Sequence, residues 1–215
     1  MNFISFRRYY LDLILEENKQ VFKGKILDIG GKKDNRRGEF QPPYDQVEEW
    51  LFLNNDNQAN PDILIDLPSI PLKDNCIDVV LCTEVLEYIY DYRELLFQMG
   101  RVIKPGGVLI LSTPFMGALH GDPEGDYYRF TEPLLIKELS DSFTIESIER
   151  MGGIVAVIYD LLRSYMSYQT KRSFLIRVVS TVFIKSNRFF IWLDKRFFKN
   201  NYYINSGFLL VVRKK

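Results

Sequence analysis

A short apolar run that ends in an acid and two glycines constrains the fold of this chain more than any other stretch. It reads Lys25-Ile26-Leu27-Asp28-Ile29-Gly30-Gly31, and its length and residue types predict a buried parallel strand over Lys25–Ile29. The two glycines allow a sharp turn after the strand, because they carry no Cβ. Ligands of open α/β sheets bind at the carboxyl ends of strands, where the strand order reverses. The run is therefore either an ordinary strand-to-loop turn or one wall of a ligand site.

Further strand-like runs alternate with helical segments along the chain, which predicts a parallel sheet covered by helices on both faces. The helix before the first strand either packs on this sheet or lies over a ligand pocket. Strands are predicted at residues 49–53, 62–67, 76–82, 108–113, 143–150 and 203–212, and helices at 3–20, 91–103 and 132–139, the last with Thr131 as its cap. We expect one α/β domain over 1–215, with a helical part over 1–22, a core over 25–150, a helical segment over 154–199 and a last strand over 203–212.

Charge and cysteine content exclude several classes of protein. Lys and Arg total 28, as do Asp and Glu, and a net charge of zero gives no general attraction to nucleic acid. Cys76 and Cys82 lack the number and spacing of a disulfide framework or a zinc site, so no metal site is predicted. No run reaches the ~18 apolar residues of a membrane span, and residues 1–10 lack the apolar core of a signal peptide. A cytoplasmic protein is predicted.

Polar residues follow the second predicted strand, at Asn54-Asn55-Asp56. A carboxylate at such a place can accept hydrogen bonds from both hydroxyls of a ribose. The alternative is a solvated turn, because Asn and Asp are common in turns.

The loop after the strand at 108–113 contains the only histidine of the chain, His120. Its ordinary pKa near ~6.5 suits a general base at neutral pH, whereas the alternative is a surface residue that only makes hydrogen bonds. The same loop carries Asp126, Tyr127, Tyr128 and Arg129. These four are candidates for substrate binding, and the alternative is a lid whose tyrosines pack on the core.

The helical segment before the last strand is basic and aromatic. From Arg163 to Lys199 its only acid is Asp194, while phenylalanines and aliphatic residues are interleaved with lysines and arginines. A basic helix with aromatics on its apolar face can lie in a membrane interface. It can equally pack on the domain, with its lysine and arginine stems solvated. Both interpretations of residues 163–199 stay open, and the first places the protein at the inner face of the membrane.

Several motifs in a fixed order resemble those of class I S-adenosylmethionine-dependent methyltransferases. They span about Lys25 to Pro114, and the segment His120–Thr131 is similar to one in bacterial methyltransferases linked to surface-polysaccharide biosynthesis. The motifs are Asp28-Ile29-Gly30-Gly31, Asp66-Leu67, Leu72–Val80, Glu84-Val85-Leu86-Glu87 and Ile103-Lys104-Pro105-Gly106-Gly107. The resemblance implies a Rossmann-like seven-stranded sheet, mostly parallel, whose last hairpin is antiparallel and carries the basic helical segment as an insertion before the final strand.

The resemblance also implies which residues contact the cofactor, S-adenosylmethionine. Asp28, Gly30 and Gly31 fall where the family lines the methionine and ribose side of the cofactor. Asp56 falls where an acid holds the ribose hydroxyls, with Asn54 and Asn55 as alternatives for that place. The remaining positions implied are Asp66 and Leu67 beside the adenine, and Thr83 and Glu84 at the start of the loop after the fourth strand.

The glycine loop departs from the family pattern of acid-x-Gly-x-Gly-x-Gly. After Gly30 the chain continues Gly31-Lys32-Lys33-Asp34, so two of the three expected glycine positions are filled otherwise. A dinucleotide needs such glycines so that the backbone can approach a pyrophosphate, whereas S-adenosylmethionine has no phosphate. The missing Gly-x-Gly-x-x-Gly also disfavours a dehydrogenase.

The sequence therefore predicts an S-adenosylmethionine-dependent methyltransferase whose acceptor is a small molecule or a glycan. We expect O-methylation of a saccharide, or of its nucleotide- or lipid-linked form, with His120 as the base. The rival from another class is a non-catalytic protein that keeps the fold and docks at a membrane or a partner through the basic segment. Methylation of another small molecule or of a protein is a third possibility, since acceptor specificity lies in loops.

Overall fold

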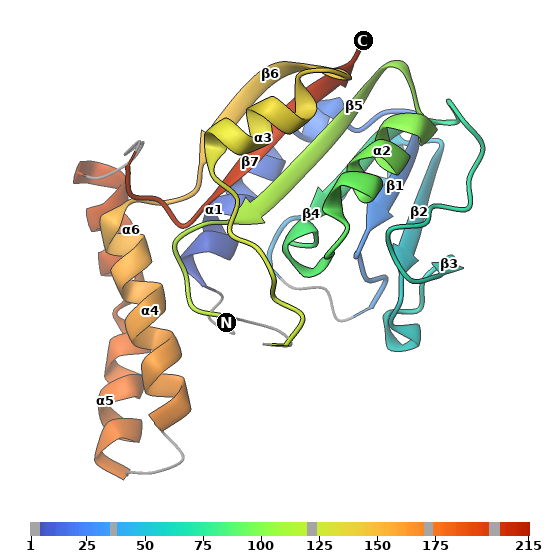
Figure 1. The fold of residues 1–215 in the computed structure, drawn as a ribbon. Coiled ribbons are helices and arrows are strands. Elements are labelled where there is room, and N and C mark those ends of the chain that lie inside the picture. The colour runs from blue at the N-terminus through green and yellow to red at the C-terminus, as the bar shows by residue number, and fades with distance from the viewer. Residues whose placement is uncertain (1–4, 35–37, 120–123, 170–173, 198–202) are drawn as a thin grey trace.

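The computed structural model describes residues 5–34, 38–119, 124–169, 174–197 and 203–215 (Figure 1). Its centre is a seven-stranded sheet with the order β3-β2-β1-β4-β5-β7-β6. The strands β1 to β5 are parallel, and β7 runs antiparallel between β5 and β6. This arrangement confirms the predicted fold class, including the antiparallel last hairpin. The strands are β1 (Lys25–Ile29), β2 (Glu49–Asn54), β3 (Ile63–Leu64), β4 (Ile77–Thr83), β5 (Ile103–Pro114), β6 (Phe143–Arg150) and β7 (Gly207–Lys214).

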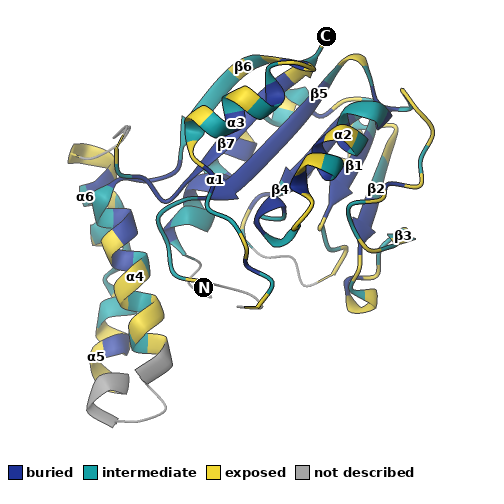
Figure 2. Ribbon diagram, viewed as in Figure 1, coloured by how far each residue is buried: buried dark blue, intermediate teal, exposed yellow. Residues whose placement is uncertain are grey.

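Alternate residues of the central strands fill two separate cores, one on each face of the sheet. Leu27, Val80 and Leu109 face α2 (Tyr92–Val102) and α3 (Glu132–Leu139). Their neighbours Ile26, Val79 and Val108 face α1 (Phe6–Glu17) and the start of α4 (Ile154–Gln169). Both sets are almost fully buried, and the inner strands are mostly dark blue in Figure 2. The sheet is therefore apolar on both faces, as expected of parallel strands covered by helices.

The connection from β1 to β2 contains no α-helix within residues 30–34 and 38–48, the part of it that the structure describes. It includes only a 3₁₀ turn, Tyr44–Gln46. Aromatic side chains cover this part of the sheet instead, with ring centroids of Phe22 and Trp50 5.3 Å apart and those of Phe22 and Phe40 5.8 Å apart. In its described part, the connection that follows β1 therefore supplies no α-helix N-terminus at the end of this strand.

Several predicted element bounds are corrected by strand pairing. The predicted bounds of β1 and β6 are confirmed, but the predicted strand at 62–67 is only two residues long, because it pairs with β2 alone at the sheet edge. The strand predicted at 108–113 begins at Ile103, before the Pro-Gly-Gly turn. The last strand begins at Gly207 rather than Tyr203, because its partner β5 ends at Pro114, opposite Gly207. The first helix runs from Phe6 to Glu17, within the predicted 3–20.

The segment inserted between β6 and β7 consists of three helices. They are α4, α5 (Phe174–Lys185) and α6 (Asn187–Phe197), and in Figure 1 they stand as a group beside one end of the sheet. The Tyr159 ring of α4 lies between Phe6 and Phe183, with centroids 4.2 and 4.4 Å away. This stacking confirms that one face of the segment packs on the domain. None of the described helices combines the length and apolarity needed to cross a bilayer.

The single acid of α6, Asp194, joins this segment to the rest of the protein. Its side chain is fully buried. It accepts hydrogen bonds from the Tyr10 hydroxyl at 2.7 Å and from the backbone N–H groups of Gly153 at 2.9 Å and Ala156 at 3.1 Å. Burial and this contact raise the pKa of the Tyr10 hydroxyl. One carboxylate therefore connects α6 with α1 and with the start of α4.

Candidate functional site

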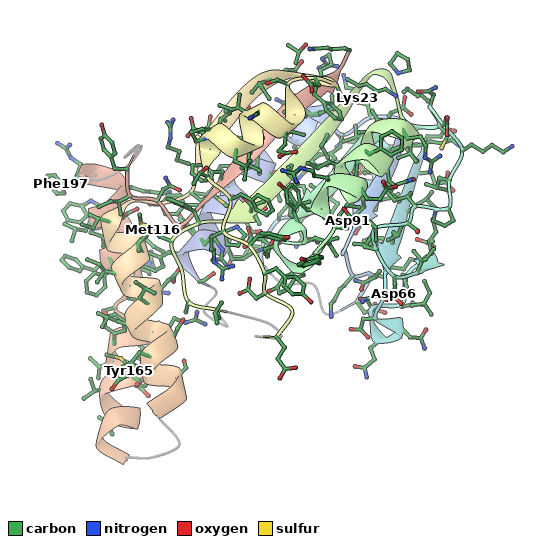
Figure 3. The ribbon with its side chains drawn as sticks, in the orientation of Figure 1. Lys23, Asp66, Asp91, Met116, Tyr165 and Phe197 are labelled. Carbon is green, nitrogen blue, oxygen red and sulfur yellow. The ribbon has the colours of Figure 1, made fainter. Side chains whose placement is uncertain are left out.

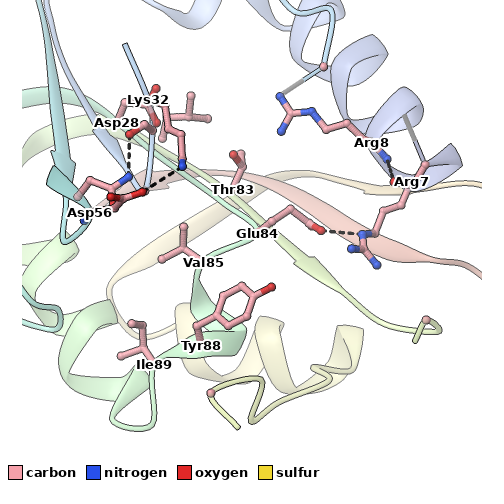
Figure 4. A pocket seen from close by; sticks show the side chains of 18 of the residues that line it. Arg7, Arg8, Asp28, Lys32, Asp56, Thr83, Glu84, Val85, Tyr88 and Ile89 are labelled. Atoms are coloured by element: carbon pink, nitrogen blue, oxygen red, sulfur yellow. Dashed lines mark hydrogen bonds and ion pairs between the residues drawn. The ribbon is translucent and has the colours of Figure 1, made fainter. Parts of the chain in front are cut away.

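A cavity of about 1540 Å³ lies at the carboxyl ends of β1, β2 and β4, where the strand order reverses on either side of β1. Figure 4 shows its walls from close by. This is the place where open α/β sheets bind ligands. The structure brings to this cavity all eight residues that the resemblance assigned to the cofactor: Asp28, Gly30, Gly31, Asp56, Asp66, Leu67, Thr83 and Glu84.

The turn after β1 is a close-fitting cradle that requires both glycines. Gly30 has φ +77°, and a Cβ there would overlap the Val85 side chain. Gly31 has an ordinary φ, but a Cβ on it would come closer than 3.0 Å to the carboxylate of Asp28. That carboxylate is buried and accepts a hydrogen bond from Trp50 Nε1 at 3.2 Å. Gly31 therefore leaves room for the Asp28 carboxylate in the cavity, while Gly30 leaves room for Val85.

The two lysines that follow Gly31, of which Lys32 stands at an expected glycine position, are held by acids near the ends of the neighbouring strands. Lys32 Nζ lies 3.3 Å from Asp56 Oδ2, as Figure 4 shows, and Lys33 pairs with Asp62. The Gln58 backbone N–H, followed by Lys32, holds the pKa of Asp56 below its usual value. Ion pairs thus fix the loop where the family pattern has further glycines.

The loop after β4 contributes the opposite wall. Glu84 has a φ of +56°, a left-handed conformation that is costly for a residue with a side chain. Its backbone N–H donates to Ser112, and its carboxylate pairs with Arg7 Nε at 2.6 Å (Figure 4). Beyond it, Val85, Tyr88 and Ile89 line an apolar part of the cavity. This wall therefore combines apolar side chains with a carboxylate held by Arg7.

Two helices cover the cavity: α1, for which the sequence left this role open, and α4, which the sequence did not assign to the site. Arg7 and Arg8 come from the start of α1, and Asp160 and Arg163 come from α4. Asp160 accepts hydrogen bonds from the backbone N–H groups of Phe6 at 2.9 Å and Arg7 at 3.1 Å, and burial raises its pKa. The helix before β1 thus both packs on the sheet and lies over the pocket. Local residue patterns could not predict that α4 contributes to the cavity, because Asp160 and Phe6 are 154 residues apart in sequence.

The four predicted substrate-binding residues divide into two groups. Tyr127 lines the cavity and is exposed. Asp126 and Arg129 form an ion pair with each other, and Arg129 also donates to the Ala118 carbonyl, so they fix the loop and do not line the cavity. Tyr128 packs on Tyr92 and donates to the Tyr90 carbonyl at 2.9 Å, which fits the alternative of a lid packed on the core. His120 lies outside the described residues.

The buried carboxyl of Glu87, in the loop after β4, predicts how the free energy of unfolding depends on pH. Burial, reinforced by the nearby Glu84 carboxylate, raises the pKa of Glu87 to about 9 from an ordinary 4.5. The folded state therefore keeps a proton that the unfolded state loses, and the stability from the protonated carboxyl is lost as pH rises toward 9. We expect the unfolding free energy of the Glu87→Gln variant, measured by urea unfolding, to fall less steeply between about pH 4.5 and 9 than that of the wild type. Parallel curves for both proteins would contradict this.

Comparison with known proteins gives the family context. Residues 44–111 match the profile of a family described as a methyltransferase domain. Malonyl-[acyl-carrier protein] O-methyltransferase of Buchnera aphidicola is 26% identical over 126 residues, which cover 55% of this chain and 51% of that protein. Ubiquinone biosynthesis O-methyltransferase of Rickettsia bellii is 31% identical over 97 residues, covering 38% and 40%. The chain spans about half or less of the length of these relatives.

Solved structures show the same fold. Geranyl diphosphate C-methyltransferase of Streptomyces coelicolor, in complex with S-adenosylhomocysteine, has a TM-score of 0.58 at 11% identity over 96% of this chain and 80% of that one. A Bacillus halodurans candidate methyltransferase has a TM-score of 0.60 at 14% identity, covering 94% and 98%. The fold and the domain match bear out the resemblance to class I methyltransferases and the cofactor it implies. The resemblance to surface-polysaccharide enzymes stays a prediction.

Proposed function

We propose that this chain, with its class I methyltransferase fold and matching domain, is an S-adenosylmethionine-dependent methyltransferase that acts on a saccharide hydroxyl, free or linked to a nucleotide or lipid. One observation carries the methyltransferase assignment. The eight residues placed by family resemblance, from four separate stretches of sequence, converge on one cavity at the switch point of the sheet. The saccharide acceptor rests on the similarity of residues 120–131 to enzymes of surface-polysaccharide biosynthesis.

The cavity fits a cationic, phosphate-free nucleoside. Its lining includes carboxylates at Asp28, Asp56, Asp66 and Glu84, which suit an ammonium, a sulfonium and ribose hydroxyls. In our proposal Asp28 with Gly30 and Gly31 holds the methionine and ribose side, and Asp56 holds the ribose hydroxyls. The described residues between β1 and β2 form no α-helix whose N-terminus could bind a pyrophosphate. This argues against a dinucleotide in the same cradle.

The other residues that line the cavity can bind and orient the acceptor of the methyl group. The bound cofactor supplies an activated methyl group, so the chain has to align the acceptor oxygen and exclude water. Arg7, Arg8 and Arg163 from the covering helices and Tyr127 from the loop line the part of the cavity left for the acceptor. His120, which follows β5 in sequence, remains our proposal for the base that takes the hydroxyl proton.

Calorimetric titration with S-adenosylhomocysteine tests the assignment. We expect saturable binding with one site per chain, because the cradle at Gly30 and Gly31 is already formed. S-adenosylhomocysteine-bound protein is then titrated with nucleotide-linked and lipid-linked sugars, and heat released by one class identifies the acceptor. No binding of S-adenosylhomocysteine at millimolar concentration would overturn the assignment and favour a non-catalytic protein that has kept the fold.

A further inference from the structure

The three inserted helices, α4, α5 and α6, which we call the helical arm, expose apolar side chains on α4 to solvent. Ile158, Leu161, Leu162 and Tyr165 are between 42% and 64% exposed. They recur at the spacing i, i+3, i+4 and i+7, so they form one stripe along the helix. The opposite face of α4, with Ala156 and Tyr159, is buried in the domain core. Helix α4 thus carries apolar side chains both toward the core and toward solvent.

The other two helices of the arm also expose apolar side chains, and Figure 3 labels Tyr165 of α4 and Phe197 of α6 in this part of the molecule. Val178, Val179 and Val182 of α5 are exposed. On α6, Phe189, Trp192 and Phe197 are each more than half exposed. The centroid of the Trp192 ring lies 6.1 Å from that of Phe189 and 6.1 Å from that of Phe197. A group of this size is unusual on a bare surface and marks a contact with another molecule or a membrane.

The charge of the helical arm indicates which kind of partner it can bind. Between Leu161 and Lys199 the sequence has nine lysines and arginines and a single acid, Asp194. That acid is fully buried and accepts three hydrogen bonds. Among the described side chains of the arm, Lys185, Arg188, Lys195 and Arg196 are exposed next to the apolar cluster. From Leu161 to the end of α6, the described surface therefore combines aromatic and aliphatic groups with positive charge and no exposed acid.

We propose that the helical arm docks on the surface of an anionic phospholipid bilayer. Aromatic and aliphatic side chains enter the headgroup boundary, while lysine and arginine stems extend to the phosphates. A second copy of the chain is disfavoured as the occupant, because a symmetric interface would bring like-charged surfaces together. Clustered cations beside apolar side chains instead match the negative surface potential of such membranes.

Docking of this kind leaves the cavity accessible. Asp160 and Arg163 of α4 line the cavity, and their helical positions place them on the side opposite the stripe at Ile158, Leu161, Leu162 and Tyr165. Membrane contact through the stripe and binding in the cavity therefore use different faces of one helix. The proposal does not rest on methyltransferase activity, and each can fail without the other.

Co-sedimentation of the full chain with vesicles tests the docking surface. We expect binding to phosphatidylcholine vesicles that contain phosphatidylglycerol, and much weaker binding to phosphatidylcholine alone. The double variant Leu162→Gln with Tyr165→Gln should lower the partition coefficient about tenfold, since it removes two side chains from the apolar contact. The variant Lys185→Gln with Arg188→Gln should lower it about 25-fold, or about fivefold per charge, and more salt should weaken the wild type similarly.

Matched controls come from exposed residues away from the arm. Phe97 on α2 is 64% exposed, so Phe97→Gln removes an equally exposed apolar group, and Lys23→Gln with Lys73→Gln removes two exposed charges. Both controls should bind like the wild type, and circular dichroism should show every variant folded. No binding to anionic vesicles, or equal loss in the controls, would overturn the proposal. So would a dimer in light scattering that the Leu162→Gln, Tyr165→Gln variant dissolves, which would identify a second copy as the occupant.

Discussion

Gly31→Ala is expected to weaken S-adenosylhomocysteine binding by about 10- to 100-fold in calorimetric titration. The new Cβ would come closer than 3.0 Å to the Asp28 carboxylate, which must then leave its place beside Trp50 in the cavity. Loss of one charge-assisted contact costs about 1.5–3 kcal/mol, which corresponds to this range. The backbone of Gly31 has an ordinary φ, so the effect comes from the displaced carboxylate and not from backbone strain.

The control for this change is Gly100→Ala in α2. A Cβ on Gly100 would meet only the Phe143 ring, at an ordinary 3.7 Å. Alanine is also the better helix former, by about 1 kcal/mol, so this variant should be slightly more stable and bind as the wild type does. If Gly31→Ala binds S-adenosylhomocysteine as tightly as Gly100→Ala, the cofactor does not depend on the turn after β1.

Asp194→Ala is expected to lower the unfolding free energy by about 3–5 kcal/mol in urea or guanidinium titration. The change leaves the buried donors of Tyr10, Gly153 and Ala156 without their acceptor. When one partner of a buried polar contact is removed, the other stays buried without a hydrogen bond, and the cost of taking it out of water is no longer offset. Because Asp194 joins α6 to α1 and to the start of α4, the loss should also loosen the helical arm.

Two variants separate this mechanism from general sensitivity to substitution. Asp45→Ala removes an exposed acid and should stay within about 0.5 kcal/mol of the wild type. Tyr10→Phe removes only one of the three donors and leaves Asp194 with two backbone partners, so its cost should be smaller, about 1 kcal/mol. An Asp194→Ala protein as stable as Asp45→Ala would show that this carboxylate does not anchor the arm.

Local patterns in the sequence were sufficient for the sheet and for one wall of the site. The apolar run Lys25–Ile29 is β1, because a strand buried on both faces has to be continuously apolar. Strand ends were less predictable, since they depend on the partner strand. Strand β7 begins at Gly207 because β5 ends at Pro114, opposite it. The residues around Tyr203 carry no local pattern that indicates where β5 ends.

The sequence by itself, through its resemblance to class I methyltransferases, determined the fold class and the placing of Asp28, Asp56, Asp66 and Glu84 at one site, and the carboxyl ends of parallel strands do meet at one edge of the sheet. Only the tertiary structure decided what covers them. Asp160 meets the start of α1 across 154 residues, and Asp126 turns out to pair with Arg129 rather than face the cavity. Such contacts form between elements far apart in the chain, and they depend on how the elements pack, which local residue patterns do not encode.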